Sequence, residues 1–310
     1  MALIRANLAE MYTPIYDKFW KEGYGEIEAV CLKFFEELSD KTMEMKLNQL
    51  SELTLYQGFG ELESVPQDNL KTLYPVILKH KKFGKRIEVS YEAVDDEEYA
   101  LLSKTLLAKE YGRQAKRTKE FYMTKLIANV FTASADYHSQ EGASVAICGD
   151  HTTLVAGTTV NNKITTQFSH DALEEMEQKV IDNARNSRGD IIPLLPRMKY
   201  LVCHPKLLRR IQRVLSERAE RRPDVTSGDI NVFAGTYQPL SLPYLAQFSG
   251  TEKYWGLVIP QGGLVITKRE DAGFTGWVNN DIKSYVFDSY MRFVVGVYDW
   301  RAIWMSDGSV

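Results

Sequence analysis

A long helix predicted over residues 95–131 limits the possible folds of this chain more than any other stretch. Asp95 can cap the start of this helix while Glu98 reaches back to it, and the acidic side chains there suit the helix dipole. At about 1.5 Å per residue, a helix of this length extends for roughly 55 Å, which is more than a compact domain of this size needs. We therefore expect a spine that lies between two lobes and alongside neighbouring molecules.

The predicted spine has one apolar stripe, and its other faces are charged. The stripe consists of residues at largely helical spacings, namely Leu102, Leu106, Leu107, Tyr111, Ala115, Tyr122 and Leu126. The charged positions are Lys109, Glu110, Arg113, Lys116, Arg117, Lys119 and Glu120. We expect the charged faces to be exposed to solvent, and Gly112 to weaken the helix by about 1 kcal/mol relative to alanine.

The overall composition is that of a soluble globular protein with room for two domains. The chain has 310 residues, of which 44% are hydrophobic and 25% charged, and its formal net charge is -3. A protein whose main role is to bind nucleic acid needs a net positive charge, so the composition does not favour a nucleic-acid-binding protein. The opening residues lack the apolar core of a signal peptide. The sequence also contains no run of about eighteen uncharged apolar residues, so no membrane-spanning helix is predicted. Cys31, Cys148 and Cys203 lack paired spacing, which indicates a reducing compartment.

The N-terminal region is predicted to be an arm followed by a short helix. Residues 1–24 show little periodicity and contain Pro14, Gly23 and Gly25. An amphipathic helix is predicted over residues 26–38 from the spacing of Ile27, Val30, Cys31, Phe34, Phe35 and Leu38. Its apolar face packs either on its own chain or on a neighbouring subunit, and the pattern leaves both open.

Residues 55–90 are predicted to form a long extended hairpin. Strand patterns at residues 74–78 and 86–90 flank the basic positions Lys79, His80, Lys81, Lys82 and Lys85. Such a hairpin offers too little apolar surface to offset the entropy of its own ordering, so we expect it to project and become ordered on another molecule. The alternative is a solvated edge hairpin whose lysines discourage association between sheets.

The middle of the chain has the alternating strands and helices of an α/β domain. After a loop-rich stretch over residues 134–162, Ser169 caps a helix that ends near Gly189. The inner stripe of that helix is Leu173, Met176, Val180 and Ala184. A strand over residues 200–203, a helix that begins at Pro205 and a strand over residues 254–259 follow.

The C-terminal region is predicted to be β structure that returns to the spine. Residues 264–268, 284–289 and 292–304 are rich in the β-branched and aromatic residues that suit half-buried strands. We expect these strands to form a second lobe together with the spine.

The cysteine and histidine residues give little support to catalysis or metal binding. Cys148 and His151 lie three residues apart in a glycine-containing loop, but His170 and His204 are scattered and no second ligand pair exists. A nucleophile at Cys148 with His151 or His204 as its base has no support from spacing. The prediction for this segment is a structured loop.

Other charged or glycine-rich stretches also have structural explanations. The acidic residues 95–98 fit a helix start better than acid–base catalysis, and Gly262-Gly263 lacks the rest of a phosphate-binding motif. Residues 206–222 contain seven basic residues, which are either solvated arginines on a packed helix or a contact to nucleic acid. We therefore expect no catalytic, cofactor-binding or metal-ligating residues and no cofactor.

Six segments, in order along the chain, resemble a known family. They are KKFGKRIEVSYEAVDDEEYALL at 81–102, ICGDHTTLVAGTTVNN at 147–162, FSHDAL at 168–173, PRMKYLVCHPKL at 196–207, GDINVFAGTYQPLSLPYL at 228–245 and MRFVVGVYDWRAIW at 291–304. Together they resemble the Mu-type major head subunit of tailed bacteriophages, which has the Hong Kong 97-like capsid fold. Cys148 departs from the pattern of that family in its loop.

The resemblance implies an α+β fold with a long spine helix and several separate regions. These are an N-terminal arm at 1–50, an extended β-hairpin loop at 51–92, a β-rich peripheral domain at 93–140 and 265–310, and an axial α/β domain at 141–264. Because no large scaffolding region precedes the arm, assembly is expected to use a separate scaffold or none.

The implied function is that of a major capsid protein of the virion, without enzyme activity and assembled in the host cytoplasm. Copies form hexamers and pentamers of an icosahedral shell that encloses phage DNA, which they contact weakly and without sequence preference. Implied partners are other copies, scaffold and portal proteins and decoration proteins, with no membrane. In some relatives a loop lysine crosslinks to an asparagine of a neighbour, for which this chain offers Lys79, Lys81 or Lys82 and Asn279 or Asn280.

Two alternatives remain open. An encapsulin-like bacterial nanocompartment shell has the same fold and encloses a cargo enzyme in place of DNA, so the contents of the particle discriminate the two. A cysteine hydrolase would use Cys148 and a histidine, and thiol alkylation would then abolish an activity.

Overall fold

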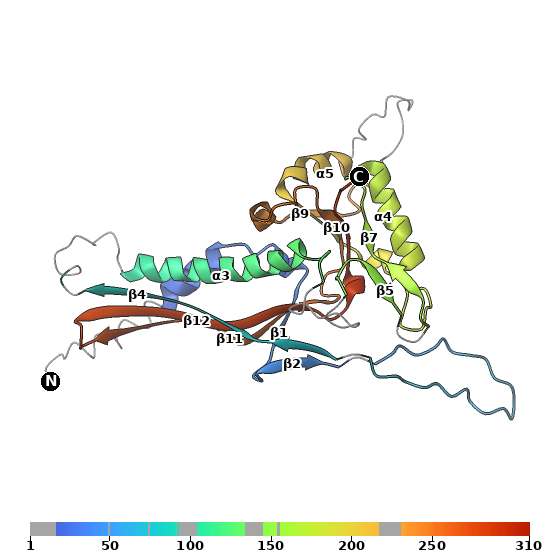
Figure 1. The fold of residues 1–310 in the computed structure, drawn as a ribbon, viewed down its shortest axis with the longest axis horizontal. Coiled ribbons are helices and arrows are strands. Elements are labelled where there is room, and N and C mark those ends of the chain that lie inside the picture. Colours follow the sequence, from blue (N-terminus) through green and yellow to red (C-terminus); the bar gives the residue numbers. More distant parts are fainter. Residues whose placement is uncertain are drawn as a thin grey trace.

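The computed structural model describes residues 17–48, 50–73, 75–90, 92, 104–133, 145–153, 156–216 and 231–310. It has an elongated lower layer, in which one helix lies along a long twisted sheet, and an upper lobe at one end of that layer (Figure 1). Below the upper lobe, a long loop drawn in blue projects away from the body. The mixture of helices and sheets confirms the predicted α+β class.

The lower layer is built on a four-stranded sheet of order β1-β11-β12-β4. Its strands are β1 (Glu36–Ser39), β11 (Leu264–Asn279), β12 (Ser284–Val297) and β4 (Lys81–Ser90). β12 pairs antiparallel with both neighbours, whereas β1 pairs parallel with β11. The strands predicted at 284–289 and 292–304 are joined, because Tyr290 and Met291 continue the pairing with β4.

The upper lobe is built on a five-stranded sheet of order β7-β13-β10-β8-β9. Its strands are β7 (Lys163–Ile164), β13 (Ile303–Ser306), β10 (Trp255–Val258), β8 (Tyr200–Cys203) and β9 (Gln238–Ser241). The strands predicted at residues 200–203 and 254–259 are confirmed. The prediction that all C-terminal strands return to the spine is wrong for β13, because a turn after β12 carries the chain across to pair with β10.

One face of this second sheet is covered by two helices, α4 (His170–Asn183) and α5 (Leu208–Val214). The Oγ of Ser169 accepts a hydrogen bond of 3.0 Å from the backbone N of Ala172, which confirms the predicted cap. The predicted inner stripe of α4 is buried. The helix ends at Asn183, earlier than expected, and Gly189 lies in a following turn with a φ of 93°. No described helix is long and apolar enough to cross a membrane.

The remaining strands and helical turns of the described residues are short. The strands are β2 (Glu44–Leu47), β3 (Val76–Lys79), β5 (Asp150–Thr152) and β6 (Thr159–Asn161). Turns of 3-10 helix lie at η1 (Cys31–Lys33), η3 (Leu195–Arg197), η4 (Pro205–Leu207), η5 (Pro243–Gln247) and η6 (Trp300–Ala302). β2 pairs with β3 and β5 with β6, so the stretch predicted to be loop-rich includes a short hairpin.

The spine is helix α3 (Lys104–Ala128), and the predicted cap at Asp95 with the acidic residues 95–98 lies outside the described residues. The prediction of a largely exposed helix is wrong. Lys119 and Glu120, expected in solvent, are 1% and 3% exposed, whereas Leu106, expected in the apolar stripe, is 54% exposed. The reason is that α3 packs against the long sheet, the N-terminal segment and η5 together.

Residues 17–26 form a helix that packs on α3, so the prediction of an arm that is not part of a folded unit is wrong for this part. Two glycines allow the close approach. A Cβ on Gly112 would collide with the backbone oxygen of Trp20, and one on Gly23 would collide with that of Lys109. Gly112, expected only to weaken the spine, therefore permits contact between the two backbones.

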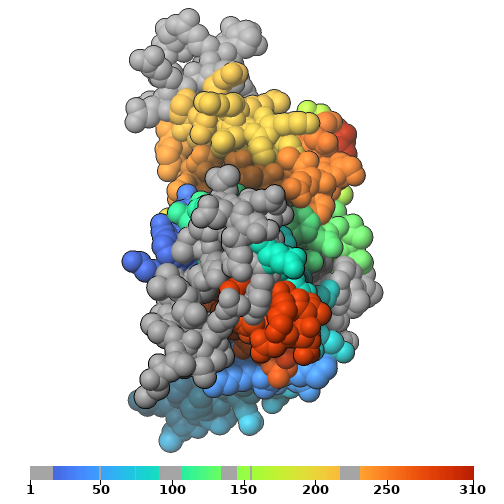
Figure 2. Space-filling view, turned by 90° about the vertical axis from the view of Figure 1, so that its left-hand side faces the viewer, coloured from blue at the N-terminus to red at the C-terminus, as the bar shows by residue number. Residues whose placement is uncertain are grey.

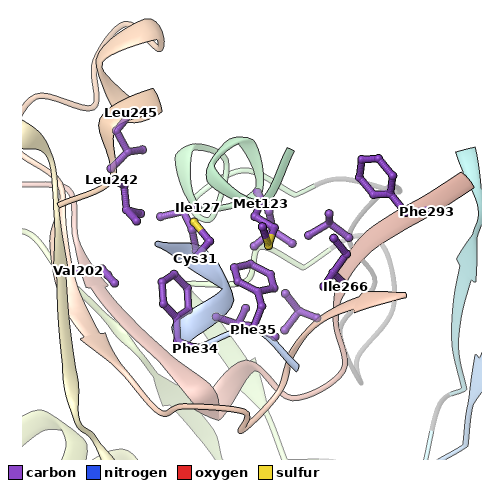
Figure 3. Packing of buried hydrophobic residues seen from close by; sticks show 14 of the residues in the cluster. Cys31, Phe34, Phe35, Met123, Ile127, Val202, Leu242, Leu245, Ile266 and Phe293 are labelled. Carbon is purple, nitrogen blue, oxygen red and sulfur yellow. The ribbon is translucent and has the colours of Figure 1, made fainter. Parts of the chain in front are cut away.

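Residues 26–38 do not form the predicted helix. They contain the 3-10 turn η1, after which β1 begins at Glu36. Phe34 and Phe35 are nevertheless buried, and they lie beside Met123 and Ile127 of the spine (Figure 3). Pairing of β1 with β11, together with burial of both rings, outweighs the helical spacing of the sequence. Of the two alternatives, packing on the same chain is the observed one.

One continuous core joins the spine, the long sheet and the upper lobe. Figure 3 shows Val202 and Leu242 of the upper lobe on one side of this core, Phe35 near its middle and Ile266 of the long sheet on the other side. The spine crosses between them with Ile127. The predicted position of this helix between two lobes is therefore confirmed.

Candidate assembly surfaces

The projecting loop consists of residues 48–75, between β2 and β3 (Figure 1). The hairpin predicted from the sequence had its basic end between residues 78 and 86, and this prediction is wrong. β3 pairs with β2, and β4 pairs with β12, so the lysines of that segment lie in or beside strands of the body. The alternating pattern identified the strands correctly but carried no information about their partners.

The projecting loop exposes large apolar side chains. Between 55% and 107% of the residue surface is exposed at Leu50, Leu53, Leu55, Tyr56, Phe59, Leu62, Val65 and Leu70. In the described part of this loop, β pairing is limited to one bridge between Leu50 and Thr72. Such a segment buries too little surface to offset the entropy of its ordering, and large exposed apolar patches mark interaction sites. The loop therefore has the properties of a segment that contacts another molecule.

Ion pairs tie the base of the projecting loop to the upper lobe. Glu52 accepts a hydrogen bond of 2.8 Å from Nη1 of Arg301 and further bonds from Ser187. Nη2 of Arg188 lies 2.8 Å from Oδ1 of Asp68. Burial acts to raise the pKa of Glu52, but the bonds from Ser187 and Arg301 outweigh it and lower this pKa to about 2. Sequence reasoning missed these pairs, because no local pattern links Glu52 to a residue 249 positions away.

The hairpin that carries the loop is also anchored on the long sheet. Val76 and Leu78 of β3 are buried in a small cluster with Val265 and Val294. Gly296 makes room for this contact, because a Cβ there would collide with the side chain of Leu78. The projecting loop thus begins from a base that is held by both layers of the molecule.

The loop that contains Cys148 is structured, as predicted, and Cys148 and His151 are buried in it. Cys148 is 1% exposed, and burial raises the pKa of its thiol far above the ordinary value. The ring of His151 stacks on that of Trp300, with centroids 4.1 Å apart. Asn162, which the sequence analysis did not single out, fixes the loop by donating from Nδ2 to the carbonyl oxygen of Ile303 at 2.9 Å. A thiol in this environment is poorly suited to act as a nucleophile.

The other candidate histidines have local structural roles. Nδ1 of His204 accepts a hydrogen bond of 3.1 Å from the backbone N of Lys206 at the start of η4. His170 begins α4, and its ring contacts Phe233. No group of three potential metal ligands occurs in the part of the chain that the structure describes. The structure does not bring these histidines together with Cys148 into one site.

The helix predicted within the basic stretch at residues 206–222 is observed as the short helix α5. Helix α5 ends at Val214, and residues 217–230 lie outside the described part of the chain. Ile211 and Val214 are buried, whereas Arg209 and Arg210 are exposed on the other face. The structural explanation, a packed helix with solvated arginines, holds for the described residues.

Two of the residues considered for a crosslink, Lys81 and Asn279, lie far apart along the long sheet. Lys81 pairs with Phe293 near one end of β12, whereas Asn279 pairs with Ser284 at its other end. The strand between these positions measures roughly 30 Å, so the two side chains of one copy cannot meet. A crosslink would have to join two copies, and it stays a prediction.

Comparison with known proteins adds a family match and a shared fold. A family model described as phage capsid protein matches residues 74–306. No curated protein matches the chain. The structure is similar to a virus-like particle from Pyrococcus furiosus, with a TM-score of 0.54 and 10% identity, covering 95% of this chain and 99% of that chain.

Two solved phage capsid structures are also similar to this chain, with slightly lower TM-scores. For the mature capsid of bacteriophage PhiM1 the TM-score is 0.52 and the identity 12%, covering 88% of this chain and 84% of that chain. For the procapsid of bacteriophage JBD30 the TM-score is 0.50 and the identity 14%, covering 98% of this chain and 76% of that chain. At identities this low, the similarity is one of fold.

Proposed function

The chain belongs to the phage capsid protein family, and from this premise we propose that its copies form hexamers and pentamers of an icosahedral shell that encloses phage DNA. It is a structural protein, a major capsid protein of the virion with the Hong Kong 97-like fold. The Mu-type subfamily, the lack of enzyme activity and assembly in the host cytoplasm are finer parts of the proposal.

The observation that carries this proposal is the projecting loop. Its large apolar residues are exposed, Tyr56 and Leu62 fully so, while its base is anchored by ion pairs. We propose that the loop lies across an adjacent copy and buries these side chains there. Obligate interfaces bury about 2,000–5,000 Å², so the loop supplies a large contact that a single copy lacks. A head-to-tail contact of this kind repeats around a ring and closes it.

The proposed domains follow the predicted boundaries with two changes. The arm at 1–50, the extended loop at 51–92, the peripheral domain at 93–140 and 265–310 and the axial domain at 141–264 form the starting division. Because β4 pairs in the long sheet, we replace the extended loop at 51–92 by the projecting loop at 48–75, which shortens the arm to 1–47. Because β13 pairs with β10, we add it to the axial domain, which corresponds to the upper lobe.

The proposed partners other than the chain itself are scaffold, portal and decoration proteins. A net charge of -3 supports weak, non-specific contact with the packaged DNA, because a strongly basic surface would hold phosphates. No membrane has a role in this proposal.

Shortening the projecting loop tests the proposal. Deletion of residues 60–82 would also remove β3 and the start of β4, so we choose replacement of residues 55–67 by a short glycine–serine linker. This change retains Glu52, Asp68 and the β2–β3 hairpin. We expect a folded subunit with an unchanged thermal midpoint that forms no closed shells in electron micrographs.

A matched control keeps the loop and changes a single residue in it. Gly58 has no atom within 4 Å of a Cβ built there, so Gly58→Ala is expected to assemble like the unmodified chain. Closed shells of normal size from the shortened variant would contradict the role of the loop in assembly.

An encapsulin-like shell around a cargo enzyme is the second candidate function. The observation that favours it is the shared fold with a virus-like particle from a cellular organism. The contents of purified particles discriminate the two. Packaged DNA supports the phage head, whereas a packaged protein of defined stoichiometry supports the nanocompartment.

A further inference from the structure

Helix α4 gives one end of the upper lobe an acidic surface. Its exposed residues include Glu174, Glu175 and Asp182, which we call the acidic edge. The helix is fixed beside β7, because Nζ of Lys179 donates to the carbonyl oxygen of Lys163 at 2.7 Å. β7 is a terminal strand of the five-stranded sheet, so the acidic edge lies at one lateral end of the lobe.

Helix α5 gives the opposite end of the lobe a basic surface. Lys206, Arg209 and Arg210 are exposed there and form what we call the basic edge. α5 packs against β9, which is the terminal strand at the other end of the same sheet. Figure 2 shows the segment around α5, in yellow, in the upper part of the molecule, away from the long sheet.

Both helices cover the same face of the sheet, so the two edges are separated along the sheet and not across it. Side chains of α4 and α5 share one core with Leu201 and Cys203. The segment at residues 231–237 lies between the helices, because Asn231 donates to the carbonyl oxygen of Val214 at 2.7 Å and Tyr237 bonds to a carboxylate of α4. The relative positions of the edges are therefore fixed by packing.

Among the described residues, the reversed positions of both edges lack ion-pair partners. Within the described residues, no ion pair involves Arg209, Arg210, Glu174 or Asp182. Isolated exposed charges are ordinary on solvated helices, but here opposite signs are segregated to opposite ends of one lobe. A two-fold contact between identical edges would bring like charges together, which is unfavourable, whereas a head-to-tail contact brings opposite charges together.

We propose that the basic edge of one copy contacts the acidic edge of the next copy around each hexamer and pentamer. This inference rests on the proposed shell function and names the surfaces that close its rings. The partner is a second copy of this chain, because one copy carries two edges of opposite sign in the arrangement that a closed ring requires. Charge pairs of this kind fix orientation and exclude wrong contacts more than they add affinity.

Reversing the charges tests this contact. The basic variant combines Arg209→Glu with Arg210→Glu, and the acidic variant combines Glu174→Lys with Asp182→Lys. Glu175 is left unchanged, because it accepts a hydrogen bond of 2.6 Å from Thr166 that holds the chain locally. Each variant alone places like charges at every contact of a ring, so we expect about tenfold or greater loss of assembled material in sedimentation velocity. The combined variant restores opposite charges and is expected to recover assembly.

A charge-matched control separates this effect from a change in net charge. Lys18 and Lys41 are exposed and lie outside the upper lobe, so Lys18→Glu with Lys41→Glu alters the net charge as much as the basic variant does. We expect this control to assemble normally. Circular dichroism and thermal unfolding of each variant check that it folds, and Arg209→Lys with Arg210→Lys provides a conservative replacement expected to assemble.

The outcomes distinguish the contact from the shell itself. If the unmodified chain forms no shells under any condition, the proposed function fails. If it forms shells and either single-edge variant does so equally well, only the edge contact is refuted. A folded combined variant that does not assemble also refutes it. If the basic variant forms normal shells that retain less DNA, the basic edge contacts nucleic acid and the proposed contact is wrong.

Discussion

Gly23 and Gly112 are the residues that let the N-terminal helix lie directly on the spine. A Cβ at Gly112 would collide with the backbone oxygen of Trp20. For Gly112→Ala, we expect overpacking to cost about 1–3 kcal/mol of the free energy of unfolding or more, which exceeds the gain of about 1 kcal/mol in helix propensity. Chemical denaturation of the unassembled subunit measures the difference.

Gly25 provides the control for this substitution. It has no atom within 4 Å of a Cβ built on it, so Gly25→Ala is expected to leave the denaturation midpoint nearly unchanged. An alanine at Gly112 that raises the midpoint would show that propensity, and not backbone contact, determines the choice of glycine there.

Glu52 makes the base of the projecting loop sensitive to acid. Its pKa falls from an ordinary value of 4.5 to about 2. A carboxyl whose pKa is lower in the folded state stabilises that state above its unfolded pKa, and this contribution is lost as the pH falls. We therefore expect the stability difference between the unmodified subunit and Glu52→Gln to shrink between pH 4.5 and 2. Denaturation curves at a series of pH values measure it, and a constant difference would contradict the assignment.

Lys119 illustrates what residue patterns do not reveal. From its charge, Lys119 was expected on a face exposed to solvent. It is instead buried, and its Nζ donates to Oδ1 of Asp271 at 2.6 Å and to the hydroxyl of Tyr24 at 3.0 Å. Asp271 reaches the helix from an irregular part of β11, where the register with β12 shifts. The sequence around Lys119 predicts neither the irregularity in β11 nor the N-terminal helix that supplies Tyr24.

At the scale of elements, the β2–β3 hairpin decides where the projecting loop begins. Leu78 of this hairpin is 1% exposed and packs on the long sheet. We expect Leu78→Ala to lower the free energy of unfolding by about 2–5 kcal/mol. The substitution removes buried methyl groups next to Gly296, which has no side chain that could fill the cavity. Hydrogen exchange in β2 and β3 is expected to rise, and the yield of closed shells to fall.

Ile77 is the matched control, since it is the neighbouring residue of the same strand and is only partly buried. Ile77→Ala is expected to raise hydrogen exchange in the hairpin much less. Equal effects of the two substitutions would mean that the hairpin is not held through its inward side.

Elements with strong local signals were predicted correctly, and those set by distant pairing were not. α4 has a cap and a full apolar stripe, and β8 and β10 have short apolar runs between turn residues, so each element was found. Residues 26–38 have helical spacing, yet β1 forms there because β11 offers a strand partner more than 220 residues away. The exposed loop was expected to project, but its tip was misplaced for the same reason.

At the scale of the whole molecule, the position of the spine was predicted correctly, although its exposure was not. The long periodic segment indicated a helix between two lobes, and α3 has that position. The acidic and basic edges of the upper lobe could not be foreseen, because the strand order that separates β7 from β9 is absent from the local pattern. The anchors of the projecting loop likewise depend on the meeting of distant segments.

The continuous core across the spine has a mechanical consequence. Phe35, Ile127 and Val202 bind the long sheet and the upper lobe into one stiff body, so the two lobes cannot bend against each other without opening well-packed apolar contacts. In the proposed shell, outward pressure from the enclosed contents would therefore act mainly on the contacts between subunits and not within them. Under excess pressure, such particles would separate at the interfaces between subunits, and the released subunits would remain folded.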